Sequence, residues 1–183
     1  MPFTTPTKAY FSGPQGNQNL PVSMNQKQFN YKNFSLNTPF EKIAPFIASE
    51  EAFDGKTWHT QSQHTGKDGG RAYGYFQIYE NHFVPGAKWY DPKWDKNFES
   101  AAKLYNVDPS KYGGQEGDFI DATTGEGRKR LLSLSYPEFN SIDSDSLSYN
   151  IAKDIYAQGG IGAWNLKENI IKSYQQGTPR HLR

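Results

Sequence analysis

The spacing of apolar residues predicts a helix near residue 50. Phe46, Ile47 and Phe53 point in one direction when successive residues are stepped by about 100° around a helix axis. They lie on one face of a helix that begins at Pro45 and ends near Phe53. Because Pro45 lacks an N–H and restricts the residue before it, we expect it to separate this helix from a short first turn that Thr38 caps.

Helical spacing recurs in the second half of the chain. The predicted segments are about 95–105, 128–134, the stretch from a cap at 144–145 to the glycine pair at 159–160, and about 163–174. Residues 115–142 otherwise have an irregular pattern. The sequence therefore predicts a mainly helical domain.

The middle of the chain has a different pattern. Residues 55–95 carry six glycines that break regular structure. Within them, RAYGYFQIYE at 71–80 has the alternating, aromatic character of one or two short strands. The predicted fold class is therefore α+β, predominantly α, with a small central β-hairpin region.

The first 38 residues differ from the rest in composition. They contain ten Asn and Gln, four Pro and no acidic residue. Residues 1–38 are therefore predicted to form an extended or disordered arm before a domain at 39–183. Its aromatic residues leave two interpretations open: a plain flexible arm, or a segment that docks on its own domain or on a partner.

Charge and composition exclude several classes of protein. Lys and Arg number 20 and Asp and Glu 19, so the formal charge is +1, without the strongly basic character of a dedicated nucleic-acid binder. The chain has no cysteine, which excludes disulfides, thiolate metal sites and cysteine nucleophiles. No segment has the continuous apolar run of a secretory signal or a membrane span, so neither is expected.

Two adjacent glutamates, Glu50 and Glu51, stand at the end of the helix predicted near residue 50. Glu50 falls about 20° from the apolar direction of that helix and Glu51 about 120° from it. Glu50 is therefore predicted to face inward and Glu51 to meet water. No cation close in the sequence pairs with Glu50, and burial without a cation keeps a carboxyl group protonated. Glu50 is thus the candidate general acid, and a position at the rim of the core is the alternative.

Three short blocks occur in order: EEAF at 50–53, GYFQI at 74–78 and YNIAKDIYAQGGIGAW at 149–164. They resemble lytic transglycosylases of the lysozyme-like family, in which a helix ends in Glu-Ser-Gly-Phe and a later hairpin reads Gly-Leu-Met-Gln-Ile. The last block is similar to the C-terminal segment of phage tail-associated members. The chain departs from the family where EA replaces Ser-Gly and YF replaces Leu-Met, and the long interval 79–145 indicates an insertion.

The resemblance implies a lysozyme-like fold and a peptidoglycan substrate, cut between N-acetylmuramic acid and N-acetylglucosamine. Glu50 would protonate the glycosidic oxygen and then take a proton from the muramic C6 hydroxyl, giving a 1,6-anhydro product. The resemblance implies no metal or organic cofactor. The substrate-binding candidates are Tyr75, Phe76, Gln77, Tyr149 and Trp164.

Structural interpretations stay open for several of these residues. Gln77 fits a satisfied polar residue on a strand, Trp164 fits a core position that seals two helices, and Tyr149 fits the opening of a helix. The basic run at 128–130 could contact an anionic wall polymer, although a solvated helix face is favoured.

A lysozyme-type hydrolase on the same scaffold needs a second carboxylate. Asp54, Asp68 and Glu80 are the nearest candidates, although they also fit a turn, a glycine-rich loop and the end of a strand. His59 and His64 with Asp68 superficially form a metal set, but their spacing fits no helical pair, and no metal site is predicted.

We therefore expect a phage-encoded enzyme that degrades peptidoglycan during cell-wall penetration or lysis. It would be made in the host cytoplasm without a signal peptide, associate with the virion, and act on the cell wall or in the periplasm. The arm would bind other virion proteins. Two other classes stay open: a catalytically inactive structural or adaptor protein of the virion on a lysozyme-like fold, and a carbohydrate-binding module.

Overall fold

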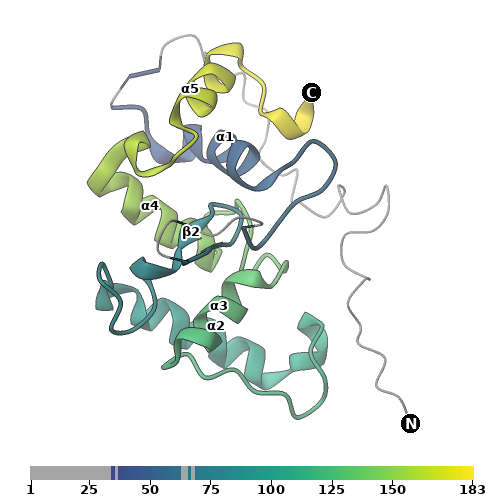
Figure 1. Cartoon of the computed structure of the whole chain (residues 1–183). Helices are drawn as coiled ribbons and strands as arrows, with labels where there is room; N and C mark the ends of the chain where they lie inside the picture. Colours follow the sequence, from purple (N-terminus) through teal and green to yellow (C-terminus); the bar gives the residue numbers. More distant parts are fainter. Residues whose placement is uncertain (1–33, 36, 63–65, 67–68) are drawn as a thin grey trace.

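A computed structural model describes residues 34–35, 37–62, 66 and 69–183 (Figure 1). The longer elements are α1 (Phe40–Ala52), β1 (Ala72–Tyr73), β2 (Ile78–Tyr79), α2 (Asp95–Val107), α3 (Gly125–Ser133), α4 (Leu147–Gly159) and α5 (Lys167–Gln176). The short 3₁₀ helices are η2 (Glu80–His82), η3 (Pro92–Trp94), η4 (Pro109–Tyr112), η5 (Gly160–Ala163) and η6 (Arg180–Leu182). This architecture confirms the α+β, predominantly α, fold class.

Helix α1 runs through Pro45 without a break, which corrects the expected interruption. Pro45 lacks the N–H that would bond the carbonyl of Glu41, and Glu41 is at an exposed position of the helix. On the other face, Ile43 and Phe46 are almost completely buried, and their packing offsets the cost of the proline. The N-cap residue is Pro39 rather than Thr38, and no side chain caps this end.

The last residues of the predicted arm contact the domain. Thr38 Oγ1 accepts a hydrogen bond from the Ser35 N–H at 3.0 Å, and the Thr38 carbonyl accepts one from the Tyr156 hydroxyl at 2.8 Å. The Phe34 ring meets the Tyr174 ring edge-on, with 5.9 Å between centroids. The rest of the arm lies outside the described residues, so its predicted extended character stays a prediction.

The hairpin lies where the alternating pattern predicted it. Strands β1 and β2 are antiparallel, in the register Ala72 with Tyr79 and Tyr73 with Ile78. The turn between them depends on Gly74, which has φ +80° and packs closely: a Cβ there would lie 2.8 Å from Ser148 Oγ. Only glycine combines that conformation with that approach.

Two predicted helices are present in the part of the chain after the hairpin. Helix α2 begins at Asp95 as expected. Helix α3 begins at Gly125, earlier than the expected start at 128, because Thr124 Oγ1 accepts a hydrogen bond from the Gly127 N–H at 3.0 Å. The cap was not visible in the apolar spacing, which starts only one turn later.

The last two helices also have shifted starts. Helix α4 is capped by Ser146, whose Oγ accepts from the Tyr149 N–H at 3.1 Å, rather than by residues 144–145. Helix α5 starts at Lys167 instead of near 163, because Trp164 adopts an extended conformation (φ −106°, ψ 140°).

The three residues of the basic run at 128–130 differ in exposure: Arg128 is buried, Lys129 is partly buried and Arg130 is exposed. Arg128 is 3% exposed: it forms an ion pair with Asp95 at 2.8 Å and donates to the carbonyls of Ala122, at 2.6 Å, and Phe83, at 3.0 Å. The preference for a solvated face is therefore wrong for Arg128. Its guanidinium joins α3, α2 and the segment after the hairpin.

Helix α1 packs against both α5 and α4 (Figure 1). Helices α2 and α3 pack together and form the other part of the domain, seen at the bottom of Figure 1. The most completely buried large side chains are mostly rings: Tyr75, Tyr105, Phe46, Phe76, Phe83, Phe98 and Phe139. Within the described residues, no helix has the length and apolar character needed to cross a membrane.

Candidate functional site

Glu50 lies in the last turn of α1 and is 9% exposed, which confirms its predicted inward direction. Its Oε1 accepts a hydrogen bond from the Ser173 hydroxyl of α5 and another from Arg183 Nη2 at 3.2 Å. Arg183 Nη2 also donates to Ser173 Oγ at 2.7 Å. The expectation that Glu50 lacks a cationic partner is wrong, because the guanidinium comes from the C-terminal segment.

Glu51 is partly buried, which corrects its expected exposure to water. The N–H of Leu166, between η5 and α5, donates to Glu51 Oε1 at 3.2 Å. Removal from water raises the pKa of Glu51 to about 7; the Leu166 N–H opposes the rise and the charge of Glu50 adds to it. Helical periodicity gives a direction but carries no information about the loop that covers this position.

The two neighbouring carboxyl groups therefore have different environments. Glu50 accepts two hydrogen bonds at one oxygen within a network that connects α1, α5 and the C-terminal segment. Glu51 accepts one backbone hydrogen bond and changes protonation near neutral pH. A carboxyl group with such a pKa can both donate and accept a proton under ordinary conditions.

The C-terminal segment lies along the end of α1. The His181 N–H donates to Ser49 Oγ at 2.9 Å, and Arg180 Nη2 donates to the carbonyl of Asp54 at 3.1 Å. The His181 ring lies 5.0 Å from the Trp58 ring, and burial lowers the pKa of His181 to about 4. His181 and Arg183 of this segment therefore bond to the last turn of α1, and Arg180 bonds to the turn that follows it.

The hairpin residues of the resemblance have mainly supporting positions. Gln77 has φ +48°, and its Nε2 donates to the carbonyls of Gly74, at 2.9 Å, and His59, at 3.2 Å. Gln77 thereby ties the hairpin to the segment that leaves α1. Tyr75 and Phe76 are 1% and 0% exposed, so neither ring presents a face to a ligand.

Tyr149 and Trp164 lie in the core. The Tyr149 ring lies 4.9 Å from that of Phe40, the first residue of α1, whereas Glu50 stands at the other end of this 13-residue helix. Trp164 Nε1 donates to the Phe76 carbonyl at 2.8 Å. Trp164 therefore has the core position that the sequence left open as an alternative, where it packs the helices against the hairpin. Tyr149 lies at the opposite end of α1 from the two glutamates.

Asp54 is engaged in the turn after α1. Its carboxylate accepts from the Thr57 N–H at 2.8 Å and pairs with His59 Nε2 at 2.8 Å; the Thr57 bond, followed by His59, holds the pKa of Asp54 far below its usual range. His64 and Asp68, the other members of the metal set considered above, lie outside the described residues. In the part of the chain that is described, no group of three or more His, Cys, Asp or Glu is arranged to hold a metal ion.

Glu80 is held at the base of the hairpin. Its Oε1 accepts from the Arg71 N–H at 2.8 Å, and its Oε2 pairs with Lys129 Nζ at 2.8 Å. The first contact closes the base of the hairpin, and the second joins the hairpin to α3. Glu80 is therefore fixed by structural partners, which does not favour it as a second catalytic carboxylate.

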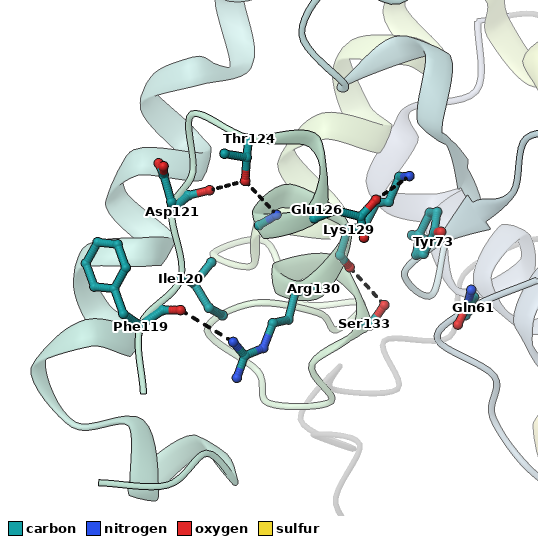
Figure 2. A pocket seen from close by; sticks show the side chains of 11 residues that line it. Gln61, Tyr73, Phe119, Ile120, Asp121, Thr124, Glu126, Lys129, Arg130 and Ser133 are labelled. Atoms are coloured by element: carbon teal, nitrogen blue, oxygen red, sulfur yellow. Dashed lines mark hydrogen bonds and ion pairs between the residues drawn. The ribbon is translucent and has the colours of Figure 1, made fainter. Parts of the chain in front are cut away.

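A pocket of about 580 Å³ lies between the hairpin and α3 (Figure 2). Gln61 and Tyr73 form one wall, and Phe119 and Ile120 stand on the opposite wall, with residues of α3 between them. The pocket begins close to the end of α1: the His59 N–H donates to the carbonyl of Ala52 at 2.7 Å, and two residues of chain from His59 to Gln61 span at most about 7 Å.

Sequence reasoning missed three partners at the end of α1. Ser173, Arg183 and Leu166 are all more than 100 positions away from the glutamates. A buried carboxylate requires donors or a cation, so the need for such partners was visible, but no local pattern identified them.

Comparison with known protein families, with curated proteins and with solved structures gives no match for this chain.

Proposed function

We propose that this chain cleaves the glycan strands of peptidoglycan as a lytic transglycosylase on a lysozyme-like fold. The single observation that carries the proposal is the carboxyl group of Glu51, partly buried at the end of α1 with a pKa of about 7. General acid–base catalysis requires a pKa near the working pH, and this group has one. The small hairpin that follows α1, with the GYFQI block, supports the same assignment.

Glu51 is preferred to Glu50 as the proton-transferring group. Glu50 Oε1 already accepts hydrogen bonds from Ser173 and Arg183, so donating a proton to a substrate requires that network to open. Glu51 has one backbone donor and lies at the surface side of the same turn. Glu50 then affects Glu51 through its negative charge, which contributes to the raised pKa of Glu51.

The proposed reaction needs one carboxyl group twice. Protonated Glu51 donates its proton to the glycosidic oxygen as the bond to the muramic C1 breaks. The carboxylate then accepts the proton of the muramic C6 hydroxyl, whose oxygen bonds to C1 and closes the 1,6-anhydro ring. The proton returns to Glu51, so the cycle is balanced without water or cofactor.

The test is to incubate the purified protein with peptidoglycan sacculi and to analyse the soluble products by mass spectrometry. The matched variants are Glu51→Gln and Glu50→Gln, each checked for folding. We expect 1,6-anhydro-muropeptides from the wild type and from Glu50→Gln, and none from Glu51→Gln. Loss of product only in Glu50→Gln would return the role of acid to Glu50, and products with reducing ends would identify a hydrolase instead.

A second candidate is a non-catalytic structural protein of a phage particle on the same scaffold. The network of Glu50, Ser173 and Arg183 favours it, because that network stabilises the fold and needs no substrate. Failure of the folded wild type to release any product from several walls would support this candidate. A place in the virion belongs to both candidates and rests on the resemblance alone. Binding of other virion proteins by the arm rests on the composition of residues 1–38.

A further inference from the structure

We propose that a basic face beside the end of α1 docks on a membrane surface that contains anionic phospholipids. The face consists of Lys56, Lys172 and Arg180 together with Leu182, and all four residues are exposed. The proposal goes beyond the proposed function and does not rest on it, because docking requires no reaction at the glutamates.

Positive charge is concentrated in the last part of the sequence. Residues 167–183 contain four Lys or Arg and a single acidic residue, Glu168, although the formal charge of the whole chain is only +1. The rest of the chain is therefore net negative. Within this part, Arg183 contributes least to an external field, because Glu50 balances its charge at 3.2 Å.

The three cations of the basic face are not balanced in this way. Within the described part of the chain, Lys56, Lys172 and Arg180 form no ion pair with a carboxylate. The guanidinium of Arg180 donates instead to a neutral acceptor, the Asp54 carbonyl, at 3.1 Å. The charges of all three can therefore act on an anionic surface outside the protein.

Arg180 lies next to the turn that carries Lys56. Its Nη2 reaches the carbonyl of Asp54, and a Cβ on Gly55 would lie 3.7 Å from the same nitrogen. Lys56 is the following residue of this turn. The turn after α1 and the C-terminal segment thus bring two cations together.

Helix α5 adds the third cation. Arg183 Nη1 donates to Gln176 Oε1 at 2.8 Å, which fixes the C-terminal segment against the last turn of α5. Lys172 stands one turn before Gln176, and residues four apart lie on the same side of a helix. Figure 1 shows α5 and the C-terminal segment together at the top of the domain, beside α1.

Leu182 adds an apolar side chain to these cations. It is 56% exposed, whereas the ring of the preceding His181 lies 5.0 Å from that of Trp58. The His181 N–H donates to Ser49 Oγ at 2.9 Å, which fixes the backbone of this segment on α1. The leucine is therefore held outward by a segment that is already ordered, so little ordering is needed when it binds.

The combination of cations with an exposed leucine distinguishes a membrane from a hydrophilic polyanion. Lys and Arg attract anionic headgroups within about a Debye length, and an apolar side chain gains free energy when it enters the boundary of the acyl chains. A phosphate polymer of the cell wall or a nucleic acid backbone offers Leu182 no apolar environment. The face therefore fits anionic phospholipids best.

The experiment measures cosedimentation of the full chain with vesicles of equimolar phosphatidylglycerol and phosphatidylcholine, and with vesicles of phosphatidylcholine alone. The test variant is Lys56→Gln with Lys172→Gln. Its control, Lys96→Gln with Lys103→Gln, removes the same charge from exposed positions of α2, at the bottom of Figure 1. We expect the wild type to bind only the anionic vesicles, the test variant to bind them about tenfold more weakly, and the control to bind them as the wild type does.

A second pair of variants tests the apolar part of the contact. Leu182→Ser removes the exposed leucine of the basic face, and Leu104→Ser removes a leucine of α2 that is 48% exposed. We expect Leu182→Ser to lower the partition coefficient about threefold or more and Leu104→Ser to leave it unchanged.

The inference would be overturned by a wild type that does not bind anionic vesicles, by equal binding to neutral vesicles, or by controls that weaken binding as much as the test variants. Binding to sacculi that carry phosphate polymers, without binding to vesicles, would assign the face to the cell wall instead. Product release from sacculi is measured separately, so the proposed function and the membrane contact can each fail while the other stands.

Discussion

Arg183 Nη2 lies 3.2 Å from Glu50 Oε1, although the two residues are 133 positions apart. Ser173 of α5 donates to the same oxygen and accepts from the same guanidinium nitrogen. The Glu50 carboxylate therefore joins three elements: α1, α5 and the C-terminal segment. Since Glu50 is 8% exposed at its side chain and Arg183 43%, the pair is intermediate between a buried and a surface ion pair.

We predict that Arg183→Ala lowers the free energy of unfolding by about 1–2 kcal/mol, because it leaves a buried carboxylate with one hydroxyl donor. Chemical denaturation at neutral pH measures the change. Lys172→Ala, which removes an exposed cation from α5, is the control and should change stability by less than about 0.5 kcal/mol. Combined with Glu50→Gln, the two losses should not add, and full additivity would show that the pair is not coupled.

Arg128 is a second cation whose burial determines how much its substitution should lower the free energy of unfolding. Its guanidinium serves Asp95 and the carbonyls of Ala122 and Phe83 at once, a set that a lysine ammonium cannot match in geometry. Arg128→Lys should therefore lower the free energy of unfolding by about 2–4 kcal/mol. Arg130→Lys, at a half-exposed position, should cost less than about 1 kcal/mol. Equal losses in the two variants would contradict the buried role of Arg128.

Much of the helical framework could be predicted from the sequence, because a buried helix face imposes its period on the residues. The inward direction of Glu50 followed from Phe46, Ile47 and Phe53 in this way. The break expected at Pro45 did not, because the packing of α1 outweighs one missing hydrogen bond. At Pro45, tertiary packing overrides the local tendency of proline to end a helix.

The environment of the site was less predictable than the fold. Periodicity describes where a side chain points, but the partners of Glu50 and Glu51 come from elements that contact α1 only after folding. Leu166 covers Glu51 because Trp164, bonded to the hairpin, ends η5 in an extended conformation. Such a loop has no signature in a single sequence.

Gly127 provides a test of the pocket's α3 wall. A Cβ at this position would lie 1.9 Å from the Asp121 carbonyl oxygen, which is backbone and cannot rotate away. We predict that Gly127→Ala lowers the free energy of unfolding by about 2 kcal/mol or more, with a lower melting temperature as the readout. Gly162→Ala, where a Cβ meets no heavy atom within 4 Å, is the control and should be neutral. A neutral Gly127→Ala would mean that the loop at 121–124 does not hold this close contact.

The raised pKa of Glu51 predicts a pH dependence of stability that is independent of any activity. Between the ordinary value of 4.5 and about 7, the folded protein binds a proton at Glu51 that the unfolded chain has released. The contribution of Glu51 to the free energy of unfolding therefore falls as pH rises through this window, by roughly 3 kcal/mol at most. Glu51→Gln removes that loss, so the variant should be more stable than the wild type at pH 8 and closer to it at pH 4.5.

Denaturation at a series of pH values checks this expectation, with Glu50→Gln as the matched control. Glu50→Gln weakens the contacts with Ser173 and Arg183, so it should be less stable than the wild type at pH 8, opposite in sign to Glu51→Gln. If Glu51→Gln is no more stable at pH 8 than at pH 4.5 relative to the wild type, Glu51 titrates as an ordinary carboxylate. The group that carries the proposed catalytic role would then lack the pKa that the role requires.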